Sequence, residues 1–259
     1  MVQKNYDFLT ENVLPGLGFA KTFDDALKAN MEAGKDKISL TAAEKISDKT
    51  FAYQINLERK EEMYYLNTVK ASITNEKQEV IAQEFQLFKQ RGFNRSEMDN
   101  LLEGRAVYKN YVNAQGERNG QWTWLDLSKT NEKENHIVRT KNDKSHDFRI
   151  VKELSKIPLV MMTADQKEDL IFDLMKGKRV AVNLIQAGGR ERMFIEANPK
   201  ISRISVYNGQ GQEIQLVKEK SNLVLTTQNG NELSEAAKKL IEKAESKSQE
   251  TPGKKLKVG

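Results

Sequence analysis

Cysteine is absent from the 259 residues of this sequence. Its absence excludes disulfides, thiolate zinc sites, iron–sulfur clusters and cysteine nucleophiles, and we therefore expect a cytoplasmic protein held together by packing alone. Long apolar runs are absent as well. Nothing approaches the roughly 18 consecutive apolar residues of a membrane span, and residues 1–7 lack the apolar segment of a secretion signal, so we expect neither a signal peptide nor a membrane partner.

Histidine is nearly absent: the only two are His136 and His146, which lie in a polar stretch. Their separation of ten residues matches no metal-ligand spacing. Gly16 and Gly18 lack the third glycine of a dinucleotide-binding motif, and Lys178 follows a glycine without the earlier glycine that a phosphate-binding loop needs. The sequence therefore predicts no catalytic residue, no cofactor and no metal.

The sequence also lacks a large excess of either charge, because 42 basic and 37 acidic residues leave a net charge of only +5. Residues 233–259 carry 7 basic and 4 acidic residues, which is +3 of that total. The remaining chain mixes both signs, as a solvated surface does, whereas phosphate binding needs basic residues concentrated on one face. Charge alone is thus a weak argument for a nucleic-acid partner.

Among the features that are present, the first is a change of period near residue 38. Residues 6–13 have helical spacing that we expect to stop at Pro15, and residues 22–34 predict a second helix with Thr22 as its N-cap. From Ile38 the apolar residues alternate with polar ones, so that residues 38–87 predict a meander of antiparallel strands.

The most informative feature is an internal repeat at an offset of 73 residues, in which Leu101–Val107 aligns with Leu174–Val180. Each copy begins with a capping-box spacing and an apolar stripe, and each stripe ends at a glycine, Gly104 or Gly177, where we expect a left-handed C′ residue. Hairpin patterns and a third strand follow in both copies. The spacing predicts that residues 94–140 and 163–216 superpose.

These patterns predict an α+β fold with antiparallel sheets and short helices. Two related helix-strand-strand-strand modules follow an N-terminal α+β segment. We expect the following divisions: residues 1–92, helices and meander; 93–157, the first module and a loop; 158–220, the second module; 221–247, a strand and an amphipathic helix; 248–259, a disordered basic tail.

Candidate partner-binding residues are aromatic or basic residues near the strand ends of both copies. They are Arg105, Arg118, Trp122, Trp124, Lys178, Arg179, Arg190 and Arg192. An aromatic and basic face can stack on bases or bind a protein. The alternative is that both indoles cover the sheet beneath its helix and that the cations only keep the strand ends soluble.

A family resemblance rests on several motifs between residues 5 and 216, namely Asn5–Leu9, Met63–Asn67, Asn100–Val107, Trp124–Leu127 and Phe194–Pro199. In these the chain resembles an uncharacterised protein family of Bacteroidota that is associated with conjugative and other mobile elements. The resemblance implies a mobile-element context and no catalytic residue.

We therefore expect a non-enzymatic accessory or adaptor protein of a mobile genetic element, with a protein or a nucleic acid as its partner. The alternative is an enzyme of unrecognised type with a site between the two modules. Asp126 and Glu196 would then be the carboxylates to examine.

Overall fold

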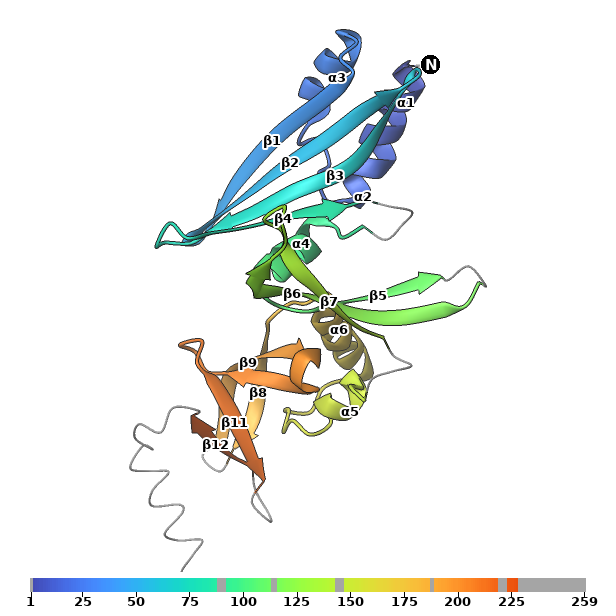
Figure 1. Cartoon of the computed structure of the whole chain (residues 1–259). Coiled ribbons are helices and arrows are strands. Elements are labelled where there is room, and N and C mark those ends of the chain that lie inside the picture. The colour runs from blue at the N-terminus through green and yellow to red at the C-terminus, as the bar shows by residue number, and fades with distance from the viewer. Residues whose placement is uncertain are drawn as a thin grey trace, which may run out of the picture.

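Three antiparallel sheets, connected by short helices, make up the computed structural model of the chain (Figure 1). It describes residues 2–87, 92–112, 116–142, 147–186, 189–218 and 223–227. The expected α+β class with antiparallel sheets is confirmed. The predicted helix within residues 221–247 and the predicted tail lie outside the described residues, apart from one strand at 223–227.

The N-terminal helical run and the helix that follows it each differ from expectation at one predicted boundary. It continues through α1 (Val2–Phe8), the π-helical turn η1 (Leu9–Val13) and α2 (Leu14–Gly16). Pro15 lies inside this run rather than ending it, because proline is tolerated in the first turn of a helix. The next helix, α3 (Asp24–Glu32), has Phe23 as its N-cap without a side-chain cap, so the assignment of Thr22 was wrong.

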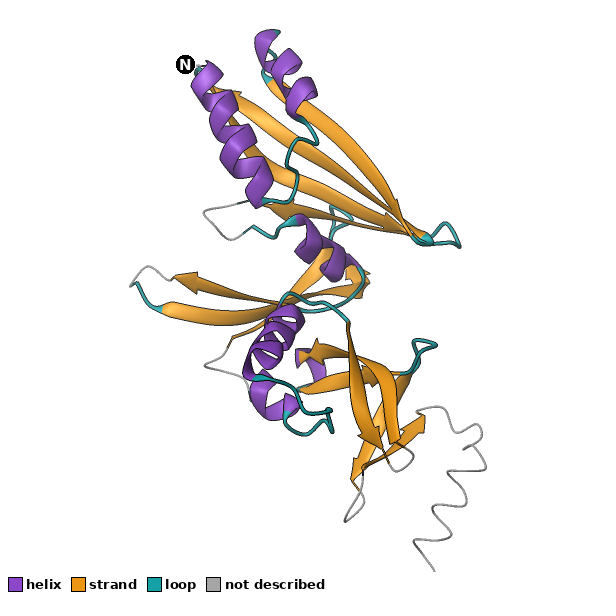
Figure 2. Cartoon of the chain, turned by 180° about the vertical axis from the view of Figure 1, so that it is seen from behind, coloured by secondary structure: helices purple, strands orange, loops and turns teal. Residues whose placement is uncertain are grey.

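The predicted meander is present as the first sheet. It consists of β1 (Lys37–Ile46), β2 (Lys49–Lys60), β3 (Met63–Thr74) and β4 (Val80–Gln86) in that order. Alternate residues of β2, from Phe51 to Leu57, are buried, as period-two patterning requires. Figure 2 shows the N-terminal helices lying across one face of this sheet.

The remaining chain forms the other two sheets, of three and five strands, together with helices α4 to α6 and the short η2. First come α4 (Arg95–Leu102) and the sheet of β5 (Val107–Val112), β6 (Arg118–Thr130) and β7 (His136–Asn142). After α5 (Ile150–Leu154) come α6 (Ala164–Met175), β8 (Val180–Gln186), β9 (Gly189–Asn198), the short 3-10 helix η2 (Pro199–Ile201) and β10 (Arg203–Tyr207). Two more strands, β11 (Glu213–Lys218) and β12 (Leu223–Thr227), extend the last sheet to five.

Both predicted capping boxes are present, at Asn94 with Glu97 and at Thr163 with Gln166. Both predicted C′ glycines have positive φ, 78° at Gly104 and 82° at Gly177. These features depend on residues within one turn of each other, which is why local spacing predicts them.

Apolar side chains gather into two cores that meet at the sheet of β5–β7. The first core joins the N-terminal helices, the first sheet and α4, and it includes Val107 and Leu125. The second core joins α5, α6 and the last sheet, and it includes Trp122 and Phe148. In the described part of the chain, no helix is long and apolar enough to cross a membrane.

Candidate functional site

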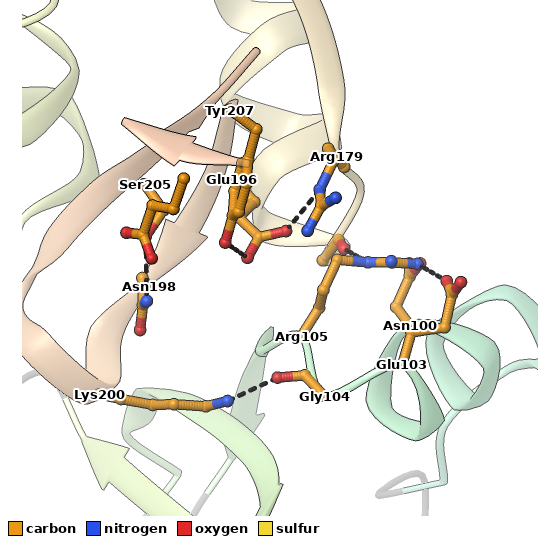
Figure 3. Close-up of polar contacts among 12 residues, drawn as sticks. Asn100, Glu103, Gly104, Arg105, Arg179, Glu196, Asn198, Lys200, Ser205 and Tyr207 are labelled. Carbon is orange, nitrogen blue, oxygen red and sulfur yellow. Dashed lines mark hydrogen bonds and ion pairs between the residues drawn. The ribbon is translucent and has the colours of Figure 1, made fainter. Parts of the chain in front are cut away.

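A cluster of polar side chains, the junction cluster, joins the C-terminal ends of α4 and α6 to the last sheet (Figure 3). Arg105 Nε donates to the carbonyl of Gly177 at 2.8 Å, and Lys200 Nζ donates to the carbonyl of Gly104 at 2.6 Å. Asn100 Nδ2 donates to the carbonyl of Lys176 at 2.7 Å. The last carbonyls of a helix lack partners within it and carry partial negative charge, so these donors stabilise both helix ends.

Arg105 is the central cation of the junction cluster. Besides the Gly177 carbonyl, its guanidinium contacts the Asn100 side-chain oxygen and the Glu103 carboxylate. Lys49 Nζ of β2 reaches the same carboxylate at 2.7 Å. Burial alone would raise the pKa of Glu103, but Arg105 and Lys49 hold it below its usual value. Arg105 is therefore engaged within the fold.

The second half of the cluster consists of Arg179, just before β8, and Glu196, on β9. Arg179 Nε donates to Glu196 Oε2 at 3.0 Å, and Tyr207 Oη donates to Glu196 Oε1 at 2.5 Å. The Arg179 guanidinium also stacks 3.9 Å from the centre of the Tyr207 ring. Burial is the largest cause that raises the pKa of the Tyr207 phenol, and its hydrogen bond to Glu196 raises that pKa further.

Lys200 lies within electrostatic range of both carboxylates that the sequence singles out. Burial lowers the pKa of its ammonium group, and the charges of Glu196 and Asp126 partly oppose that shift. Asp126 itself accepts hydrogen bonds from Ser128 and Arg139. Each carboxylate is thus already held by neighbouring donors, an arrangement suited to positioning strands rather than to moving a proton.

Those sequence-predicted site residues whose side chains the structure describes do not share one face. Lys178 binds Asp173 Oδ1 at 2.6 Å, and Arg105 and Arg179 belong to the junction cluster.

Trp122 is only 3% exposed and packs between Tyr108 and Phe148, while Trp124 is partly buried against the second core. The backbone of Arg118 pairs with Val112, whereas its side chain is not among those that the structure describes.

Arg190 and Arg192 differ from the other candidates. Both are exposed on β9, where they stand opposite Ile185 and Asn183 of β8 and share one face with them. Within the described residues neither arginine has an ion-pair partner. Ile185, which is 55% exposed, was missed by the sequence reasoning, although its alternation with the buried Leu184 is a usable signal. We call Asn183, Ile185, Arg190 and Arg192 the hairpin face.

Two cavities lie around the last sheet. One of about 400 Å³ lies between α6, the preceding loop and β8. The other, of about 450 Å³, lies between α5 and β10–β11, where Lys156 binds Glu153 and Arg203 binds Glu213 at 2.6 Å and 2.9 Å. The charges around the second cavity neutralise each other.

No group of three or more metal-ligating side chains occurs in the part of the chain that the structure describes. In comparisons with known proteins, no family model, curated protein or solved structure matches this chain.

Proposed function

We propose that this chain is a non-enzymatic accessory or adaptor protein of a mobile genetic element, and that it binds a protein or nucleic-acid partner through the hairpin face. One observation carries the proposal: Arg190 and Arg192 lie on the same face of β9, exposed and without an ion-pair partner among the described residues, beside the exposed Ile185. The described cations Arg105, Lys178 and Arg179 already bind acceptors in the chain. The mobile-element context rests on the family resemblance.

The segments 94–140 and 163–216 are, on this proposal, related modules in which the second presents the partner surface. Their common order of helix and three antiparallel strands, their capping boxes and their terminal glycines support the relation. The junction cluster then serves to fix one module on the other. An enzymatic role for Asp126 and Glu196 has less support, since both carboxylates are occupied by internal donors.

A polyanionic partner is tested first, because two exposed arginines on one strand face, with no ion-pair partner in the part of the chain that the structure describes, suit phosphates. Fluorescence anisotropy with labelled single-stranded and duplex oligonucleotides is measured over a salt series. If both arginines contact phosphates of duplex DNA, the slope of log affinity against log salt should be about −1.8. The double variant Arg190→Ala/Arg192→Ala should abolish this binding, whereas Arg190→Lys/Arg192→Lys should retain most of it.

Two controls separate the hairpin face from general charge. Lys35→Ala/Lys37→Ala removes the same charge from exposed positions at β1 and should leave binding unchanged. A chain ending at Ser246 lacks the lysines of the last residues and should bind as well as the full chain. Binding that disappears with those residues, or persists in the double arginine variant, would rule out the hairpin face; no oligonucleotide binding at low salt would leave a protein as the partner.

A further inference from the structure

The cavity between α6 and β8 is a groove with an apolar floor and an acidic rim. Leu170 of α6 and Val182 of β8 are buried beneath it, and Met162 packs against the same core. Met161, at its mouth, is 95% exposed. A cavity of about 400 Å³ lies within the range of binding pockets in proteins, roughly 300–1,000 Å³.

One wall of the groove is the edge of β8, which is only partly paired. On the side away from β9, the N–H of Ile185 donates to Pro158 and the carbonyl of Asn183 accepts from Val160, and there the pairing ends. Backbone groups of a strand alternate between its two edges, so the N–H and carbonyl of Ala181 also point away from β9, into the groove. Among the described residues, no hydrogen bond reaches them.

The opposite wall is the acidic helix α6, which carries Asp165, Glu168, Asp169 and Asp173 against one lysine. Asp169 and Asp173 line the groove. Lys178 neutralises Asp173, whereas Asp169 is exposed and has no ion-pair partner in the described part of the chain. At Ala181, the described residues thus leave backbone groups of the β8 edge open beside an apolar floor and the exposed carboxylate of Asp169.

We propose that this groove binds an extended basic peptide segment of a partner protein, which adds to the edge of β8 as a further strand. Its backbone pairs with Ala181, its alternate apolar side chains enter the floor, and a lysine or arginine meets Asp169. The site lies at the strand edge and does not use Arg190 or Arg192. It therefore stands whether or not the hairpin face binds nucleic acid.

The test uses the full chain and a short fluorescent peptide in which lysine alternates with valine, with binding measured by anisotropy. The same peptide with glutamate for lysine should not bind, and a peptide N-methylated at alternate amides, which cannot pair with a strand, should lose binding. Asp169→Lys should weaken the affinity about tenfold or more. Glu168→Lys makes the same charge change on the same helix, outside the groove lining, and should have a much smaller effect.

A second variant tests the strand edge itself. Ala181→Pro removes the groove-facing N–H without removing a bond to β9, which is where strands tolerate proline, and it should abolish binding, whereas Ala181→Ser should not. Equal binding of the N-methylated peptide, or no effect of Asp169→Lys, would overturn the proposal, as would absence of binding at millimolar peptide. Binding that appears only after residues 247–259 are removed would assign the groove to the chain's own basic end and overturn the partner assignment.

Discussion

Two acidic residues two positions apart on α4 illustrate how partners, rather than burial alone, decide a pKa. The Glu97 side chain is 1% exposed, yet Lys109 Nζ and Lys176 Nζ reach its oxygens at 2.7 Å and 3.0 Å. Burial alone would raise the pKa of Glu97, but these lysines and the Asn94 N–H hold it below its usual value. Asp99 accepts a hydrogen bond from Tyr53 Oη at 2.6 Å, and no lysine of the described residues forms an ion pair with it. Burial raises the pKa of Asp99 to about 6, against the opposing effects of Tyr53 and Arg95.

Asp99 should therefore make the protein less stable at neutral pH than it is in mild acid. Its folded-state pKa of about 6 lies above the unfolded value near 3.9. Between these values the folded state binds more protons than the unfolded state, so the free energy of unfolding falls as pH rises through this interval. Asp99→Asn should remove that penalty and raise the free energy of unfolding at pH 7 by about 1–2 kcal/mol. This is less than the full pKa shift would give, because solvent screens the partly solvated carboxyl group.

Urea denaturation of Asp99→Asn and the parent chain at several pH values between 4 and 7.5 measures this difference. The two chains should converge near pH 4, where Asp99 is protonated in the folded protein. Asp169→Asn, an exposed position on α6, is the matched control and should change stability by less than about 0.5 kcal/mol at every pH. A stability difference between Asp99→Asn and the parent that does not vary with pH would contradict the assignment.

At the residue scale, the sequence predicted what depends on near neighbours. Glu97 was identified as a capping-box residue from its spacing to Asn94, and that is confirmed. Its second role, as the buried acceptor for Lys176 of α6, joins residues 79 positions apart and has no local signal. The same holds for Arg105, whose acceptor Gly177 lies 72 positions further along the chain.

At the scale of elements, the two helix-ending glycines have the same backbone conformation but different surroundings. A Cβ on Gly104 would meet one methyl carbon of Leu127 at 3.3 Å, which a side chain can relieve. A Cβ on Gly177 would meet the carbonyl oxygen of Ala106 at 2.9 Å, as well as Val107 and Asn100. The C-terminus of α6 therefore presses directly on the backbone between α4 and β5.

Gly177→Ala should consequently destabilise the protein by about 3 kcal/mol, and Gly104→Ala by about 1 kcal/mol. Both substitutions incur the cost of positive φ, about 1–2 kcal/mol, but only the first adds overpacking against backbone, about 1–3 kcal/mol. Chemical denaturation provides the measurement. Gly16→Ala is the control, because Gly16 is helical and a Cβ there meets nothing within 4 Å, so it should be neutral or slightly stabilising. Equal losses at Gly104 and Gly177 would show that the close approach is not maintained.

Element order was more predictable than element packing for a physical reason. Capping boxes, C′ glycines and strand alternation lie within single helices and strands, whereas the face that a strand turns toward a given helix depends on the whole chain. The Trp122 and Trp124 pair shows the limit: their spacing predicts a shared face, and only the fold directs that face toward α6 and the second core. Arg190 and Arg192 show the converse, since their position near a strand end marked them as candidates but could not show that they have no ion-pair partner among the described residues.

At the scale of the whole molecule, the sheet of β5–β7 is a layer shared by both cores. Val107 and Leu125 face the first core, while their neighbours Tyr108 and Trp124 face the second. The polar contacts of Glu97 with Lys176 and of Arg105 with Gly177 also join α4 and the segment before β5 to the C-terminal end of α6. Disrupting one core therefore removes the support on which one side of this layer packs.

The two cores should accordingly unfold together, and the positions of the tryptophans allow a direct test. The chain has two tryptophans, Trp122 and Trp124, and both report on the second core. Leu101 is fully buried in the first core. Leu101→Ala should cost about 2–5 kcal/mol and lower the midpoint of the thermal transition seen by tryptophan fluorescence by about 5–15 °C. Leu184→Ala, equally buried in the second core, should lower the same midpoint and shows that fluorescence follows that core. A tryptophan transition that Leu101→Ala leaves unmoved, while circular dichroism separates into two steps, would mean that the shared layer does not couple the two cores.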